Sequence, residues 1–215
     1  MTPCRALAWA VLAGAPGYGC GLAFNNPLGI DSQAVSAAGL VLLLRMEEPA
    51  WNGTPGEVLD VSGLLNHGTA SGALTTTPSG YFGRGGTFDG SGCVTVPDAP
   101  ALRPTTALTY TAWVYPTVLG GAPGLIAKRI AFGNQSAYTA YIETGDRLFV
   151  DIDTEDDRFS ANTVFTINQW RHVAVVFDGS LPSASRVSVY VDGALDIVAP
   201  ETSATISAFT SDLQI

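Results

Sequence analysis

The chain has 215 residues, of which 47% are hydrophobic and only 13% are charged, with 24 glycines and 13 prolines. Nineteen acidic residues against ten basic ones give a formal net charge of −9, which argues against a nucleic-acid partner and against anionic lipid headgroups. The same acidity suits a cation such as Ca²⁺, which prefers carboxylate and carbonyl oxygens. The length fits one domain of generous size.

Residues 1–19 have the three parts of a secretory signal peptide. Arg5 supplies the positive charge, residues 6–15 form an apolar run too short to span a bilayer, and residues 14–19 are rich in small side chains. Residues 20–36 mix asparagine, proline and glycine without periodicity, which predicts a linker or a lipid tether. We therefore expect the protein to be secreted or anchored to the cell envelope.

The end of this leader resembles the cleavage site of bacterial lipoproteins, in which a lipid-bearing cysteine follows a small residue. Gly19, Cys20 and Gly21 carry the resemblance, but Gly17 stands where an aliphatic residue is usual and Tyr18 where a small one is usual. Three alternatives stay open: lipidation of Cys20, ordinary cleavage near it, and a buried N-terminal strand. A lipid on Cys20 is the only membrane contact that we expect.

After residue 36 the apolar residues recur in short runs rich in β-branched and aromatic side chains, and no window has helical spacing. Turn pairs such as Asp89-Gly90 and Asp192-Gly193 separate the runs. About ten short strands at this spacing predict an all-β sandwich or barrel. The expected strands are 40–46, 86–88, 93–96, 108–115, 125–128, 138–143, 147–153, 171–177 and 186–191.

Strand periodicity also predicts which side chains face the core. In residues 110–115 the even-numbered side chains occupy one face and the odd-numbered ones the other, and the three valines of residues 187–191 alternate inward. Trp170 and His172 share a face because they lie two residues apart on a strand. We expect Trp170 to fill the core and His172 to donate a hydrogen bond inside or beside it.

Five motifs follow one another in order along the chain: DVSG and NHG in residues 60–68, FG and TFDGSG in 82–92, LTYTAWVYP in 108–116, QWRHVAV in 169–175 and VYVDG in 189–193. Together they resemble the laminin-G-like jelly-roll domains of the concanavalin A-like lectin and glucanase superfamily. The resemblance implies an all-β, two-sheet antiparallel jelly-roll sandwich for residues 37–215. It also implies a further strand beyond residue 215, so we expect this domain to lack its final strand.

The turn at residues 60–68 is the best metal candidate. Asp60 and Asn66 offer oxygen ligands, and the neighbouring glycines allow backbone carbonyls to turn inward. The resemblance adds that many such domains hold calcium where this turn meets the last strand, so calcium is the expected cofactor. The alternative is an Asx turn that is closed by hydrogen bonds alone.

The densest acidic stretch lies in residues 151–157. It fails as a calcium-binding EF-hand loop, because position six is Asp156 and position twelve is Asn162. Asp151 to Glu155 resembles the E-x-D-x-E strand of laminarinase-like enzymes on the same fold. A retaining glycosidase needs carboxyl groups ~5–5.5 Å apart, and a short aspartate closes that distance poorly. We therefore expect a solvated strand face here and no catalytic residues.

Aromatic rings next to polar side chains are the usual platform for sugars on β-sandwiches. Trp51, which precedes an asparagine, and the loop with Phe132, Asn134 and Tyr138 have this mixture, and we predict these four as ligand-binding residues. The favoured function is a non-catalytic extracytoplasmic module that recognises carbohydrate or an extracellular protein. The alternatives are a glycoside hydrolase or lyase that uses Asp151 and Glu155, and an adhesive spacer of a longer surface protein.

Overall fold

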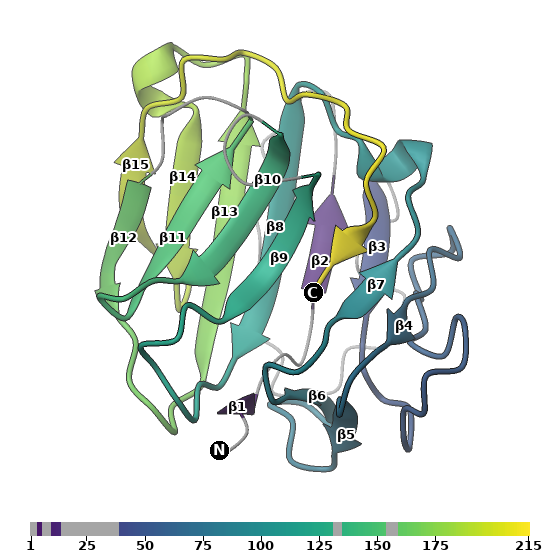
Figure 1. The fold of residues 1–215 in the computed structure, drawn as a ribbon. Helices are drawn as coiled ribbons and strands as arrows, with labels where there is room; N and C mark the ends of the chain where they lie inside the picture. Colours follow the sequence, from purple (N-terminus) through teal and green to yellow (C-terminus); the bar gives the residue numbers. More distant parts are fainter. Residues whose placement is uncertain (1–3, 6–9, 14–38, 131–134, 154–158) are drawn as a thin grey trace.

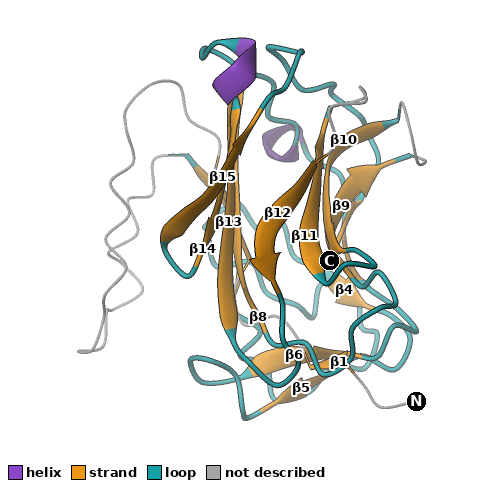
Figure 2. Cartoon of the chain, turned by 90° about the vertical axis from the view of Figure 1, so that its left-hand side faces the viewer, coloured by secondary structure: helices purple, strands orange, loops and turns teal. Residues whose placement is uncertain are grey.

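Two antiparallel sheets face each other across one hydrophobic core in the computed structural model, which describes residues 4–5, 10–13, 39–130, 135–153 and 159–215. A small third sheet lies at one end of the sandwich (Figures 1 and 2). The described residues contain no α-helix, only the single 3₁₀ turns η1 (Pro100–Leu102) and η2 (Ser183–Ser185). The predicted two-sheet antiparallel sandwich is confirmed.

The first sheet has seven strands in the order β12-β11-β10-β9-β16-β7-β4. Its last strand in the chain, β16, is inserted between β7 and β9 and pairs antiparallel with both. The strands are β4 (Thr69–Ala70), β7 (Val94–Val96), β9 (Gly124–Arg129), β10 (Ser136–Ile142), β11 (Arg147–Ile152), β12 (Phe159–Val164) and β16 (Leu213–Gln214).

The second sheet has six strands in the order β15-β14-β13-β8-β2-β3, and the small third sheet has the order β1-β6-β5. The strands of the second sheet are β2 (Ala10–Ala13), β3 (Leu40–Leu44), β8 (Ala107–Val114), β13 (Arg171–Asp178), β14 (Val187–Val191) and β15 (Ala194–Ala199). Those of the third are β1 (Cys4–Arg5), β5 (Thr75–Thr77) and β6 (Gly85–Phe88).

The predicted side-chain alternation holds on the central strands. Tyr110, Ala112 and Val114 of β8 lie in the core, as do the three valines of β14. The hairpin between β14 and β15 turns at Asp192 and Gly193, whose φ angles of 52° and 82° are those of a type I′ turn. The core is therefore built from the alternate residues that the sequence pattern marks.

Part of the predicted leader takes a place in the second sheet. Ala10–Ala13 forms strand β2 between β3 and β8, which corresponds to the third alternative for this segment, an N-terminal strand. Residues 14–38, including Cys20, lie outside the described residues, so lipidation and cleavage stay predictions. Within the described ranges, no helix has the length and apolar character that crossing a membrane would need.

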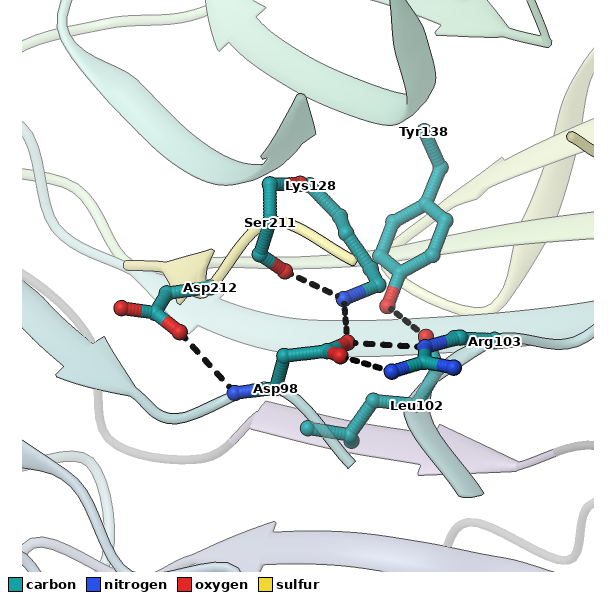
Figure 3. Close-up of polar contacts among 7 residues, drawn as sticks. All are labelled: Asp98, Leu102, Arg103, Lys128, Tyr138, Ser211 and Asp212. Carbon is teal, nitrogen blue, oxygen red and sulfur yellow. Dashed lines mark hydrogen bonds and ion pairs between the residues drawn. The ribbon is translucent and has the colours of Figure 1, made fainter. Parts of the chain in front are cut away.

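A buried ion pair holds β16 in its sheet (Figure 3). The side chain of Lys128, on β9, is fully buried, and its Nζ donates to Asp98 Oδ1 at 2.7 Å and to the carbonyl oxygen of Ser211 at 2.6 Å. The backbone N–H of Asp98 in turn donates to Asp212 Oδ1 at 3.0 Å. These bonds join the residues that follow β7, the end of β9 and the residues that lead into β16.

Asp98 also pairs with Arg103, which donates from Nε at 3.1 Å and from its terminal nitrogen to the other carboxylate oxygen. The hydrogen bonds from Arg103, followed by those from Lys128, lower the pKa of Asp98 to about 2. Tyr138 donates its phenol hydrogen to the carbonyl of Leu102 at 3.0 Å, which fixes η1 against β10. Figure 3 shows Arg103 and Lys128 converging on the carboxylate of Asp98, with Tyr138 bonded to Leu102 beside them.

Candidate functional site

The structure does not bring the four predicted ligand-binding residues together. Trp51 is 6% exposed and packs edge-on against Phe88, while its Nε1 donates to Glu48 Oε2 at 3.1 Å. Tyr138 is fully buried in the core between the sheets. A buried ring offers no face to a sugar, so these two assignments are wrong for this conformation. Phe132 and Asn134 lie outside the described residues.

Asp60 is buried and ringed by hydrogen-bond donors. Its Oδ1 accepts from the backbone N–H groups of Leu43 and Ser62, at 2.9 and 2.8 Å, and its Oδ2 accepts from the hydroxyl of Ser62 and the N–H of Asn66, at 2.8 and 2.9 Å. The side-chain amide of Asn66 donates to the carbonyl of Val41 at 2.9 Å. One carboxylate thus closes the turn and ties it to β3.

These contacts fit an Asx turn better than a calcium site. A carboxylate has about four lone-pair positions, and four donors already occupy those of Asp60. A bound Ca²⁺ would need oxygen ligands where the protein presents hydrogens. Across the described ranges, no group of three or more histidine, cysteine, aspartate and glutamate side chains is placed to hold a metal ion.

The acidic stretch is less solvated than its sequence predicts. Asp151 and Asp153 are both buried, and Asp153 adopts a left-handed φ of 62° while its Oδ1 accepts from the N–H of Ser207 at 2.8 Å. The expectation of a solvated strand face is therefore wrong at these two positions. Glu155, the other half of the predicted glycosidase pair, lies outside the described residues together with Asp156 and Asp157.

Aromatic rings gather instead on the outer face of the second sheet, opposite the core-facing side of β8. Trp113 lies there and stacks on Tyr81 with ring centroids 3.5 Å apart and planes 12° apart. Phe82 meets both rings edge-on. Trp170 contacts Tyr81 edge-on at 5.7 Å and Tyr115 at 5.2 Å. We call Tyr81, Phe82, Trp113, Tyr115 and Trp170 the aromatic patch.

Two rings of the aromatic patch are open to solvent. Tyr81 is 42% exposed and Phe82 is 48% exposed, although both carry large apolar surfaces. Trp113 and Trp170 are half-buried beneath and beside them. Exposed apolar groups that gather in one place on a soluble protein mark sites of interaction more often than isolated ones do.

A firmly anchored turn presents these rings. The N–H of Gly80 donates to the carbonyl of Gly83 at 3.0 Å, which closes the turn around Tyr81 and Phe82. Arg84 then fastens it, because its guanidinium donates to the carbonyls of Glu48 and Pro49 and to the hydroxyl of Thr76. Such anchoring lowers the conformational entropy that a ligand must remove on binding.

Trp170 does not fill the core as predicted. It precedes β13 and belongs to the outer aromatic patch, while Val173, Val175 and Phe177 of that strand face the core. His172 lies on the same outer face, buried against Trp113 at a centroid distance of 5.1 Å. The shared face of Trp170 and His172 was thus predicted correctly, but the side of the sheet was not.

Burial lowers the pKa of His172 from its ordinary value of 6.5, and the nearby carboxylate of Asp192 opposes that shift in part. The folded state therefore takes up a proton less readily than the unfolded state. The contribution of this neutral side chain to stability is complete above pH 6.5 and is lost as the pH falls below that value.

We expect the free energy of unfolding to decrease from pH 7 toward pH 5, and this dependence to flatten in the variant His172→Gln. Urea titrations across that range measure the slope. His67→Gln, at the only other histidine of the chain, is the matched control. A slope that persists in His172→Gln and disappears in His67→Gln would contradict the assignment.

The sequence profile of a laminin-G family, described as the concanavalin A-like lectin/glucanases superfamily, matches residues 88–215. No curated protein matches the chain. Among solved structures, the native heptameric SAP-like pentraxin from Limulus polyphemus is similar, with 17% sequence identity and a TM-score of 0.37. That similarity covers 56% of this chain and 52% of the pentraxin, so the chain spans about half the length of that structure.

Proposed function

The chain belongs to the concanavalin A-like lectin/glucanase superfamily, and from this premise we propose that it is a non-catalytic extracytoplasmic module that binds carbohydrate through its aromatic patch. The observation that carries the proposal is the pair of exposed rings, Tyr81 and Phe82, held over Trp113 by an anchored turn. The superfamily membership supports a binding role for sugars or proteins in general. The aromatic patch supplies a specific surface for it.

Carbohydrate is the favoured ligand because flat rings and polar groups occur side by side. Sugar rings have apolar C–H faces that pack on aromatic side chains, and hydroxyls that need hydrogen-bond partners. The carboxylate of Glu47 lies next to Gly83 at the edge of the patch and accepts from the N–H of Arg84 at 3.0 Å. Gln169, exposed and next to Trp170 in the sequence, is a second polar group near the patch.

Replacing Tyr81 with alanine is expected to weaken binding of the best glycan from a glycan array by about tenfold, which corresponds to the loss of roughly 1.4 kcal/mol of ring contact. Isothermal titration calorimetry measures the affinity. The matched control is Tyr141→Ala on β10, because this tyrosine stacks on Phe149 at 4.6 Å on the other sheet. Equal losses in both variants would contradict the aromatic patch as the site.

A reducing-end assay tests whether the chain cleaves the glycan that it binds. The best glycan is incubated with the chain, and new reducing ends are counted over time. Release of reducing ends that disappears in Asp151→Asn would favour the hydrolase alternative. Two results together would favour a protein ligand at the same patch instead of a sugar. No glycan on the array would bind, and a purified extracellular protein would bind the chain but not the variant Tyr81→Ala.

A further inference from the structure

Glu47 and Glu48 are neighbours in the sequence, but only Glu47 keeps a free acceptor oxygen. Both carboxylate oxygens of Glu48 are occupied, because Oε2 accepts from Trp51 Nε1 at 3.1 Å and Oε1 accepts from the N–H of Leu59 at 3.0 Å. Glu47 is exposed, and its Oε2 accepts from the N–H of Arg84 at 3.0 Å. Among the described residues, none donates to its Oε1. This oxygen is therefore available to a hydrogen-bond donor from outside the protein.

The turn that carries the exposed rings of the aromatic patch also holds this carboxylate. Gly83 directly follows Phe82 and adopts a left-handed φ of 61°. A Cβ atom at this position would push the carboxylate of Glu47 away, whereas glycine lets it lie against the turn. The N–H of Arg84, one residue later, fixes the carboxylate in that place. A negatively charged acceptor thus lies beside the turn that presents Tyr81 and Phe82.

The two arginines that stand close to patch residues in the sequence have their donors committed within the protein. The guanidinium of Arg84 donates to two backbone carbonyls and to the hydroxyl of Thr76. The guanidinium of Arg171 donates to the carboxylate of Asp192 and to the side chain of Gln169. Neither cation is left to pair with an acidic ligand, so the charge that a ligand meets at this edge of the patch is negative.

A sugar without acidic groups matches both features of this surface. Its C–H face can pack on a ring, and its hydroxyls can donate to Glu47 Oε1 in charge-assisted hydrogen bonds, which are roughly twice as strong as neutral ones. A uronic acid, a sialic acid or a sulfated sugar brings a second negative charge to the same place. Like charges that face each other without a cation oppose binding, and the net charge of −9 adds to this repulsion.

We propose that Glu47 is a specificity-determining residue of the sugar site: it accepts hydroxyl hydrogens from the ligand and restricts the aromatic patch to glycans that carry no acidic group. This inference rests on the proposed function, because it assigns the charge class of the glycan that binds at the same patch. The rings provide contact area for any sugar, and Glu47 discriminates between neutral and acidic ones.

The test is a glycan array that carries neutral glycans together with sialylated, sulfated and uronate-containing ones. The full chain, Glu47→Gln, Tyr81→Ala and the control Glu143→Gln are applied under the same conditions. Glu143→Gln also removes one negative charge, but Glu143 directly follows β10 on the other sheet and accepts from the hydroxyl of Ser160. Glutamine at position 47 keeps an acceptor for the N–H of Arg84, and the melting temperature of each variant checks that it is folded.

We expect the full chain to bind neutral glycans and to leave the acidic ones unbound. Glu47→Gln should weaken binding of the neutral glycans by about tenfold, through the loss of charge-assisted hydrogen bonds, and should reduce the discrimination against acidic ones. Glu143→Gln should change neither. Acidic glycans that bind the full chain as well as neutral ones do, and that require Tyr81, would keep the patch as the sugar site but overturn the role of Glu47.

Unchanged affinity and unchanged selectivity in Glu47→Gln would also overturn that role. The discrimination shown by the full chain is read from the same array and does not depend on how well any variant folds. An array on which no glycan binds the full chain would contradict the proposed function itself, and this inference with it.

Discussion

Replacing Asp98 with alanine is expected to lower the free energy of unfolding by about 3–5 kcal/mol, because it leaves the charge of Lys128 uncompensated in the core. The side chain of Lys128 is fully buried, and Asp98 is its only carboxylate partner among the described residues. The carbonyl of Ser211 accepts from the same Nζ but carries no net charge. Urea unfolding at neutral pH measures the loss.

A pair of variants separates the ion pair from ordinary packing. Lys128→Met removes the buried charge and keeps an unbranched apolar side chain, so it is expected to destabilise far less than Asp98→Ala. The double variant Asp98→Ala/Lys128→Met is expected to recover part of the stability that Asp98→Ala loses. Equal losses in Asp98→Ala and Lys128→Met, with no recovery in the double variant, would contradict the account.

The same carboxylate predicts how the protein responds to acid. The pKa of Asp98 is lowered from 3.8 to about 2 in the folded state, so its contribution is complete above pH 3.8 and is lost as the pH falls toward 2. The acid transition of Asp98→Ala is therefore expected to lack this part of the pH dependence. The stability that is lost when His172 takes up a proton falls in a separate and higher pH range.

Replacing Asp60 with alanine is expected to lower the free energy of unfolding by about 3 kcal/mol. The change removes a buried acceptor of four hydrogen bonds and leaves the N–H groups of Leu43 and Asn66 without this partner. Asp89→Ala is the matched control, because Asp89 accepts in the same way from the N–H and hydroxyl of Ser91, but in an exposed turn. We expect that control to lower the free energy of unfolding much less than Asp60→Ala does, because water can replace the lost acceptor in an exposed turn.

Calcium titration decides between the two interpretations of this turn. If hydrogen bonds alone close it, added Ca²⁺ or a chelator should leave the melting temperature of the unmodified chain unchanged. A calcium-dependent rise in the melting temperature that disappears in Asp60→Ala would show that the carboxylate exchanges its donors for a cation. Asn66→Ala then tests the second predicted ligand by the same measurement.

The sequence predicted the core strands well because their signal is local. The valines of β14 alternate cleanly, so periodicity alone assigned them to the core, and it separated the two faces of β8 without showing which one is buried. The sequence stretches of β12 (FSANTV) and β15 (ALDIVA) carry a weaker pattern. They lie at the edge of each sheet, where Asp196 accepts from the backbone N–H groups of Asn162 and Thr163. Pairing across the sandwich stabilises such strands, and no sequence window reports it.

The aromatic residues were harder to place because a ring has the same sequence signature in a core as on a surface. Trp51 and Tyr138 looked like a sugar platform and lie in the core, whereas Trp170 was expected inside and lies outside. One local signal for the patch was present: Tyr81 and Phe82 stand together between Gly80 and Gly83.

The insertion of β16 between β7 and β9 determines when the domain can complete its fold during synthesis. Asp98 and Asp212 meet across 114 residues of sequence, and until Leu213–Gln214 emerges the two parts of the first sheet have no strand to join them. Contacts of such long range form slowly. A nascent chain would therefore keep the two parts of this sheet unjoined until Leu213–Gln214 had left the ribosome.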